Sequence, residues 1–190
     1  MKVAAPLTAK GIELINFERS HCELYSEWLK DDYILEMTDT DGMTLEDIIL
    51  SQESYAEEED KITVLLSVNK EGSANEKVLI GDCNLFIDYV DEEGDVGELN
   101  VMVAEKDYRR KGYAIKAVAL MIMWAHKNCN LNEFMAKIKL SNEASYNMFK
   151  KLGFTTKTVS KAFKEYELRF TYTNESAKTL VSTVGIPFKI

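Results

Sequence analysis

The chain has 190 residues, of which 46% are hydrophobic and 29% are charged. These values are typical of one globular domain that closes its own core, and they exclude disordered and fibrous proteins. No apolar run reaches the ~18 residues that a membrane helix needs, and the first residues lack the apolar stretch of a secretory signal. We therefore expect a cytoplasmic protein with no membrane partner.

The formal net charge of -9 argues against a nucleic-acid partner, because a polyanion requires a basic face. Acidic residues form the runs 57–60 and 91–93, whereas the basic residues of segment 106–116 form a dense cluster. The simplest functional interpretation is a local anion site in an acidic protein. Solvated surface charge is the alternative, above all for the acidic runs.

The cysteines, Cys22, Cys83 and Cys129, are widely spaced and match neither a disulfide framework nor a zinc pattern. We therefore expect free thiols, a reducing compartment and no metal site. A nucleophilic cysteine would need a histidine as its base, and only His21 and His126 are present. Both histidines are better explained as ordinary helix residues, which disfavours a cysteine enzyme.

The N-terminal half predicts a strand, two helices and a meander of strands. The first strand covers residues 12–17, and the first helix begins at Ser20. A capping box, Thr44–Asp47, begins the second helix, which runs to about Ala56. A polar stretch, 31–42, connects the two helices. The strands of the meander follow at residues 62–68, 78–88 and 97–104.

The C-terminal half begins with a long helix from Gly112, whose apolar residues cover a broad face, as a helix packed on a sheet requires. This helix separates strand 97–104 from the next strand, 134–140, so the crossover makes the two strands parallel. Asn142 caps a short helix that ends at Gly153. The last segments are a hairpin of strands 155–160 and 165–172 and a tail, 174–190, without usable periodicity.

A basic loop, Arg109 to Ala114, lies between the meander and the long helix. Unpaired amides of the first helical turn and the helix dipole favour an anion at this place, and basic side chains add to the attraction. Gly112 lets the backbone approach a ligand, and the small Ala114 leaves space for phosphates. Alone, such a loop is also compatible with an ordinary turn. Neither GxxxxGK[ST] nor GxGxxG is present, which disfavours P-loop and Rossmann proteins.

A second segment, Asn142 to Phe154, lies on the next predicted helix and corroborates the loop. Together the two segments resemble the GCN5-related N-acetyltransferase (GNAT) superfamily. Arg109, Gly112 and Ala114 match its pattern of Gln or Arg, two residues, Gly, one residue, then Gly or Ala. The superfamily's later pattern of Asn, helical residues and Gly-Phe matches Asn142 and Gly153-Phe154.

The resemblance extends from about Gly11 to Tyr172 and looks closest to the N-acetyltransferase 9-like branch, through Glu27-Trp28-Leu29, segment 81–86 and Gly97-Glu98. It implies an α/β (α+β) fold in a single domain over residues 1–173. The sheet would be central, mixed and mostly antiparallel, with about seven strands, a splay between strands 4 and 5, and about four flanking helices.

The resemblance also implies acetyl-CoA as the cosubstrate and assigns residues to it. Backbone groups of Met102, Val103 and Ala104 would bind the pantetheine arm, and Asn142 would contact it in addition to capping its helix. The pyrophosphate would be held by the amides of the loop, which are those of Arg109, Arg110, Lys111, Gly112, Tyr113 and Ala114.

The chemical step is the attack of a neutral amine on a thioester, which requires a proton acceptor, a polarised carbonyl and a stabilised thiolate. The backbone amide of Val103 is our candidate for polarising the carbonyl. Glu98, acting directly or through water, is the candidate base, with a structural carboxylate paired to a cation as the equal alternative. Where many members carry a tyrosine for the thiolate, this chain has Phe149, so we assign that role to Ser145 rather than Tyr146.

The first functional hypothesis is therefore an enzyme that transfers acetyl from acetyl-CoA to a primary amine, with a protein or peptide N-terminal α-amine favoured over lysine or a small amine. The second is a catalytically weak CoA-binding module that acts through protein contacts, which Phe149 supports. The acceptor and the oligomeric state stay open at this point.

Overall fold

A single sheet forms the frame of the fold. A computed structural model describes residues 1–38, 40–73, 75–89 and 94–185, and in these ranges eight strands are ordered β1-β2-β3-β4-β5-β6-β8-β7. All neighbouring strands are antiparallel except β5 and β6. The strands are β1 (Leu7–Ala9), β2 (Ile12–Asn16), β3 (Lys61–Asn69), β4 (Lys77–Asp88), β5 (Val96–Val103), β6 (Glu133–Lys139), β7 (Thr155–Ser160) and β8 (Glu165–Thr171).

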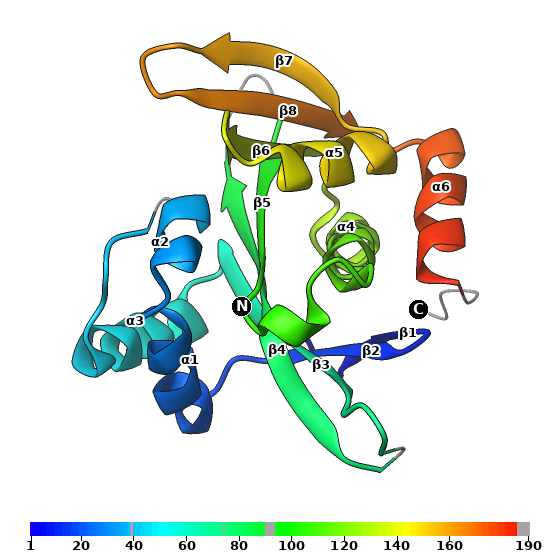
Figure 1. Ribbon diagram of the computed structural model, residues 1–190. Coiled ribbons are helices and arrows are strands. Elements are labelled where there is room, and N and C mark those ends of the chain that lie inside the picture. The colour runs from blue at the N-terminus through cyan, green and yellow to red at the C-terminus, as the bar shows by residue number, and fades with distance from the viewer. Residues whose placement is uncertain (39, 74, 90–93, 186–190) are drawn as a thin grey trace.

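The helices lie on both sides of this sheet (Figure 1). Helices α1, α2 and α3 gather on one side, and α4 and α6 lie on the other. The helices are α1 (Cys22–Trp28), α2 (Asp32–Thr38), α3 (Leu45–Glu57), α4 (Tyr113–Cys129), α5 (Glu143–Leu152) and α6 (Asn174–Val184), with 3-10 turns η1 (Arg19–His21) and η2 (Lys106–Tyr108). The predicted mixed, mostly antiparallel α/β (α+β) fold is confirmed.

The main core lies between the sheet and α4. Every residue from 117 to 125 in α4 is buried, so this helix is apolar around its whole circumference. Its outer face is covered by α6, whose Leu180 and Val184 are fully buried in the same cluster. The long buried helix predicted from Gly112 is therefore confirmed.

Besides the two 3-10 turns, the described ranges contain one strand and two helices that the sequence pattern does not predict: β1, α2 and α6. Helix α2 lies in the stretch predicted as a polar connection, and α6 lies in the tail predicted to lack usable periodicity. A capping box begins α6, where the Ser176 amide donates to the Thr173 hydroxyl at 3.1 Å and the Thr173 amide donates to the Ser176 hydroxyl at 2.8 Å. Residues 91–93, predicted as a surface acidic run, and 186–190 of the tail lie outside the described residues.

The sheet opens between β5 and β6. Their parallel pairing covers Val96, Gly97 and Glu98 on β5, and among the described residues no pairing continues beyond Glu98, although β5 extends to Val103. The predicted splay between strands 4 and 5 is confirmed. These two strands are β5 and β6 in the structure, since the unpredicted β1 shifts the numbering by one. One edge of the second half of β5 is thus left without a strand neighbour.

A β-bulge in β4 sets the position of this half of β5. The register skips Ile80, whose carbonyl accepts from the amides of Ala104 at 2.7 Å and Glu105 at 3.2 Å. At the next residue, Gly81, an added Cβ would lie 2.0 Å from the Met102 carbonyl oxygen. Only glycine permits this approach, so the bulge and Gly81 together hold the end of β5 close to β4.

None of the helices in the described ranges combines the length and the apolarity that a membrane crossing requires. In the same ranges, no group of three or more His, Cys, Asp or Glu side chains could hold a metal ion.

Candidate active site

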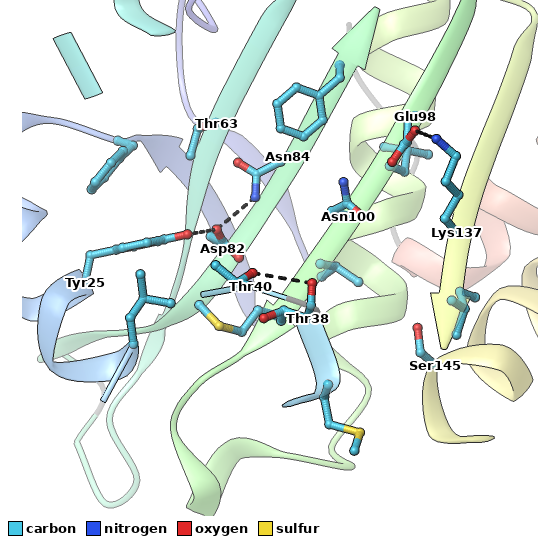
Figure 2. Close-up of a pocket in the computed structure, with 18 of the residues that line it drawn as sticks. Tyr25, Thr38, Thr40, Thr63, Asp82, Asn84, Glu98, Asn100, Lys137 and Ser145 are labelled. Atoms are coloured by element: carbon cyan, nitrogen blue, oxygen red, sulfur yellow. Dashed lines mark hydrogen bonds and ion pairs between the residues drawn. The ribbon is translucent and has the colours of Figure 1, made fainter. Parts of the chain in front are cut away.

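A cavity of about 430 Å³ opens where β5 and β6 separate (Figure 2). Its walls come from α1, α2 and α3 on one side and from β4, β5, β6 and α5 on the other. β5 contributes Glu98, Asn100 and Met102, which share a strand face by the two-residue period. Lys137 of β6 and Ser145 of α5 line the opposite wall. The cavity joins residues that are distant in sequence and lies beside the unpaired edge of β5.

Asn142 ties the start of α5 to α2. Its side-chain oxygen accepts from the Ser145 amide at 3.0 Å, so the predicted N-cap is confirmed. Its side-chain nitrogen donates to the Met37 carbonyl at 3.3 Å, near the end of α2. Asn142 therefore holds together two walls of the cavity that come from opposite halves of the chain.

Ser145 and Phe149 lie one helical turn apart on the cavity side of α5. Ser145 lies with its hydroxyl near the wall formed by β6 (Figure 2). Phe149, at the place where a tyrosine would stand, is only 2% exposed and packs edge-on against Phe154 with a centroid distance of 4.9 Å. It closes the floor of the cavity with an apolar ring and has no proton to donate, so Ser145 is the hydroxyl that α5 brings to this wall.

The backbone of β5 presents alternate residues to alternate edges. The Ala104 amide bonds to Ile80, and the Met102 carbonyl points at Gly81, so both residues direct backbone groups to β4. The alternation directs the backbone groups of Val103 to the open edge, where its carbonyl accepts from the Arg109 Nε at 2.9 Å. Of the three residues predicted to bind pantetheine through their backbone, the geometry therefore favours Val103 over Met102 and Ala104.

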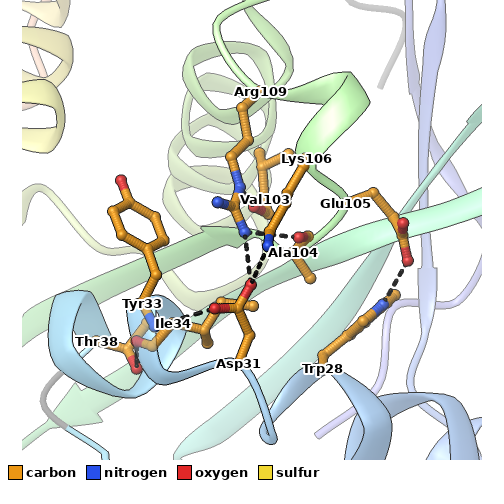
Figure 3. Close-up of polar contacts among 10 residues, drawn as sticks. All are labelled: Trp28, Asp31, Tyr33, Ile34, Thr38, Val103, Ala104, Glu105, Lys106 and Arg109. Atoms are coloured by element: carbon orange, nitrogen blue, oxygen red, sulfur yellow. Dashed lines mark hydrogen bonds and ion pairs between the residues drawn. The ribbon is translucent and has the colours of Figure 1, made fainter.

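The side chain of Arg109 binds the protein itself (Figure 3). Besides Val103, it donates from Nη2 to the Ala104 carbonyl at 2.7 Å, lies 3.6 Å from an Asp31 carboxylate oxygen and stacks over the Tyr33 ring at 4.7 Å. It therefore fastens the end of β5 to α2. Its own amide donates to the Lys106 carbonyl at 3.2 Å. Both the side chain and the amide of Arg109 are therefore engaged within the protein, and neither is left to bind a pyrophosphate as predicted.

Two further residues of the loop, Arg110 and Gly112, have left-handed backbone conformations, which glycine adopts easily and arginine does not. Gly112 is the N-cap of α4 with a φ of 83°, and an added Cβ there would meet no atom within 4 Å. Arg110 has a φ of 62°, which is uncommon for a residue with a side chain. Lys111 pairs with Glu71 and lies 5.5 Å from the Tyr108 ring centroid.

The remaining predicted loop residues begin α4 itself. Tyr113 packs against Tyr108 at a centroid distance of 6.2 Å, and Ala114 is half-buried beside it. The amides of this first turn have no partner within the helix, and the space where a side chain of residue 112 would lie is open. An anion site here would rest on these amides and the helix dipole more than on the basic side chains.

Glu98 forms an ion pair with Lys137, with 2.9 Å between the carboxylate oxygen and Nζ. The carboxylate raises the pKa of Lys137, first through its hydrogen bond. Glu98 lies five positions before Val103, which is ~17 Å along an extended strand. A base that far from the Val103 amide could not act directly on an amine held there, so the geometry leaves either a relay through water or the structural alternative for Glu98.

A buried polar network on the facing wall was not among the predicted site residues. The Asp82 carboxylate is 2% exposed, and one of its oxygens accepts from the Tyr25 hydroxyl at 2.7 Å and the Asn84 amide at 2.9 Å. Asp82, Asn84 and Phe86 all line the cavity from β4. The sequence did contain a signal for this network: these residues alternate along an otherwise apolar strand and so share one face. A charged residue inside a buried strand is rarely without a partner.

Burial raises the pKa of the Asp82 carboxyl, and hydrogen bonds from Tyr25, Asn84 and the backbone amides of Asp82 and Met102 oppose this effect. Burial, followed by the nearby Asp82 carboxylate, also raises the pKa of Tyr25 well above its usual value. The phenol therefore stays protonated and donates to the carboxylate at physiological pH.

Comparisons with known proteins agree with this architecture. The family model described as an acetyltransferase (GNAT) domain matches residues 12–155. An N-acetyltransferase 9-like protein of Caenorhabditis briggsae is 39% identical over 163 residues, which cover 84% of this chain and 82% of that protein. The alpha/beta-tubulin-N-acetyltransferase 9 of Mus musculus is 32% identical over 180 residues, which cover 92% of this chain and 74% of that protein.

Solved structures share the fold at low sequence identity. A spermidine N-acetyltransferase from Vibrio cholerae, in complex with CoA and spermine, has a TM-score of 0.74 at 12% identity. The match covers 85% of this chain and 96% of that chain. The arrangement of strands and helices around the splay is therefore shared with a protein whose structure contains CoA.

Proposed function

The chain belongs to the GNAT acetyltransferase family, and we propose that, as an acetyl-CoA-dependent N-acetyltransferase, it acts on the N-terminal α-amine of a protein. The observation that carries a protein substrate is the similarity to the Mus musculus protein named alpha/beta-tubulin-N-acetyltransferase 9, which covers 92% of this chain. We also propose a cytoplasmic location, which the wide cysteine spacing supports.

The chemistry of the amine supports an α-amine over a lysine. An N-terminal α-amine has a pKa of about 7.7–8.0, whereas a lysine side chain has one of about 10.4. Near neutral pH a substantial share of α-amines is therefore already neutral and can attack a thioester. The proton acceptors in this site are carboxylates, which are weak bases. A weak base removes a proton more easily from an α-ammonium group than from a lysine ammonium group, so the site favours the α-amine.

The residues at the splay fit a CoA molecule. The Val103 carbonyl already accepts from Arg109, so at the open edge of β5 the Val103 amide is the group left to bind the acetyl end of the pantetheine arm, and Asn142 lies at the start of the facing helix. The α4 amides beside Gly112 would hold the pyrophosphate, because an added Cβ at Gly112 meets no atom within 4 Å and the helix dipole favours anions there. When bound, acetyl-CoA supplies the thioester that is attacked.

The chain's own groups would then serve the reaction from three sides. The Val103 amide would donate to the thioester carbonyl oxygen, where negative charge develops. The Ser145 hydroxyl would donate to the sulfur as the C–S bond breaks, in place of a tyrosine at Phe149. The apolar floor at Phe149 would keep water away from the reacting atoms.

The test is a turnover assay on peptides with the N-termini of α- and β-tubulin, following free thiol and locating the acetyl group by mass spectrometry. Each peptide is paired with a version whose α-amine is blocked and whose lysines are free. We expect kcat/KM to be ~10-fold or more higher for the free α-amine. Acetylation of lysines alone would contradict the α-amine proposal. CoA binding without turnover on any peptide would support the catalytically weak module instead.

A further inference from the structure

Asp82 is a buried carboxylate that the reaction as described so far does not use. Within the described ranges its partners are a phenol, an amide and backbone N–H groups, and none of them is a cation. Buried carboxylates are normally paired with a cation or coordinate a metal. A carboxylate that lines a cavity without such a partner is suited to a cationic ligand.

Asp82 lies on the strand next to the half of β5 that would bind the thioester. Asp82 is the cross-strand partner of Met102, so the two Cα atoms lie ~5 Å apart and the side chains point to the same face. Met102 directly precedes Val103, whose backbone groups lie on the open edge. The wall that carries Asp82 is thus adjacent to the half of β5 where the thioester would bind.

Two neighbours fix the direction of the carboxylate. Tyr25 reaches it from α1, on the side of the cavity opposite α5, and Asn84 reaches it along the same strand face (Figure 2). Both hydrogen bonds end on the same carboxylate oxygen, and the backbone amides of Asp82 and Met102 also donate to the carboxylate. These donors favour the charged form and hold it in a single orientation.

We propose that Asp82 binds the acceptor's amino group and accepts its proton, and that Tyr25 and Asn84 position the carboxylate for this role. The inference rests on the proposed acetyl transfer and adds the base. The acceptor would enter as an ammonium ion and form a charge-assisted hydrogen bond with Asp82. Asp82 would take one proton, so the nitrogen lone pair becomes free to attack the thioester carbonyl carbon.

A C–N bond forms and the C–S bond breaks, while the second proton that the nitrogen loses passes to the departing sulfur through Ser145 or water. Asp82 then releases its proton to solvent. In sum, an ammonium and a thioester give an amide, a thiol and a proton, and no oxidant or further reactant is needed.

The experiment compares Asp82→Asn with Asp88→Asn, a matched change at an exposed residue of the same strand outside the cavity. The assay uses acetyl-CoA and, from a set of tubulin N-terminal peptides, a lysine peptide and spermidine, the amine that the wild-type chain acetylates fastest. We expect kcat/KM for the amine to fall ~100- to 10,000-fold in Asp82→Asn, with CoA affinity within about twofold of wild type. Asp88→Asn is expected to match wild type.

The stability of the same variant separates a functional role from a structural one. Burial disfavours the charged form of Asp82, and asparagine can still accept from Tyr25. A carboxyl whose pKa is raised by folding destabilises the folded state once the pH exceeds that pKa. The asparagine NH2 group would, however, no longer accept from the backbone amides that bond the carboxylate, and this loss offsets the gain. We therefore expect Asp82→Asn to have a Tm close to that of wild type while its activity is lost.

Tyr25→Phe supplies a second variant with a pH readout. Among the described residues, the Tyr25 phenol of α1 bonds Asp82 and the Cys83 thiol follows it on β4, and burial raises the pKa values of both groups. The titratable side chains of Tyr55, Glu98, Lys137 and Glu165 line the same cavity. Removing the Tyr25 hydrogen bond would raise the pKa of Asp82 further, because that bond favours the charged form. The acidic limb of the kcat/KM profile is expected to move to higher pH.

Three results would overturn the proposal: at least half of the wild-type kcat/KM in Asp82→Asn, an equal loss in Asp88→Asn, or a fall in Tm or CoA affinity that accounts for the lost activity. If the acidic limb of the kcat/KM profile is unchanged in Tyr25→Phe, Tyr25 does not position the Asp82 carboxylate. Wild-type turnover on lysine peptide or spermidine alone would contradict the α-amine proposal and leave the Asp82 comparison intact, because the faster amine serves as the probe. If the wild-type chain acetylated none of these amines, both proposals would fail.

Discussion

The phosphate loop at residues 109–114 and the polar network around Asp82 lie in the same site but depend on the chain in different ways. The loop is continuous in sequence, and its anion site comes from backbone amides at the start of α4. The network joins Tyr25 and Asp82, which are 57 residues apart, through side chains. Substitutions in the loop should therefore affect the cosubstrate, and substitutions in the network should affect the acceptor.

Gly81→Ala should have the largest effect, because Gly81 lets the end of β5 pack against β4, and both the cosubstrate site and the Asp82 network need β5 in this position. Its new Cβ would lie 2.0 Å from the Met102 carbonyl oxygen, so β4 and β5 would have to separate. We expect the free energy of unfolding in urea to fall by about 3 kcal/mol, with loss of both CoA binding and turnover. Gly42→Ala, where nothing lies within 4 Å, is the control and should change stability by less than ~0.5 kcal/mol.

Gly112→Glu should damage the loop and leave the network intact. A carboxylate at the N-terminus of α4 would repel the pyrophosphate, and CoA affinity by calorimetry should fall about 100-fold. Gly112→Ala carries the same strain at a φ of 83° without the charge, so it isolates the electrostatic part. Equal losses in the two variants would show that the backbone conformation, and not an anion site, explains the effect.

Arg109→Met tests the connection between β5 and α2. The variant loses the hydrogen bonds to the Val103 and Ala104 carbonyls, and we expect about 2 kcal/mol less stability and ~10-fold weaker CoA binding. Lys106→Met is the control, because the Lys106 side chain is 74% exposed and lies 3.5 Å from Asp31. That variant should lose less than ~0.5 kcal/mol. A loss of CoA binding without any loss of stability would instead indicate that Arg109 contacts the cofactor.

Glu98→Gln should have the smallest effect and sharpens the contrast with Asp82. The Glu98 pair with Lys137 is partly exposed, so its loss should change stability by less than ~1 kcal/mol. We expect kcat/KM within about threefold of wild type, which is far smaller than the loss from Asp82→Asn. A loss of 100-fold or more would return the role of base to Glu98.

Much of this fold can be predicted from local patterns. The buried α4 has an apolar surface all round, the Thr44 and Asn142 caps follow side-chain rules, and the strands of the meander alternate or run apolar. The exceptions have specific causes. Helix α2 has one buried residue, Ile34, which is too few for a recognisable helical stripe. Helix α6 does carry the helical spacing Ala177, Leu180, Val181 and Val184 behind its capping box, so the prediction of a tail without usable periodicity was wrong although the signal is present in the sequence.

The features of the site also fall into those that short segments predict and those that only packing sets. The phosphate loop, the Asn142 cap and the place of Ser145 follow from short segments, since each depends on residues within one or two turns of a helix. The pairing of Glu98 with Lys137, the hold of Arg109 on β5 and the burial of Asp82 beneath Tyr25 follow from packing alone. Neighbours that are distant in sequence set the environment of a charged side chain, and that environment decides which carboxylate can serve as a base.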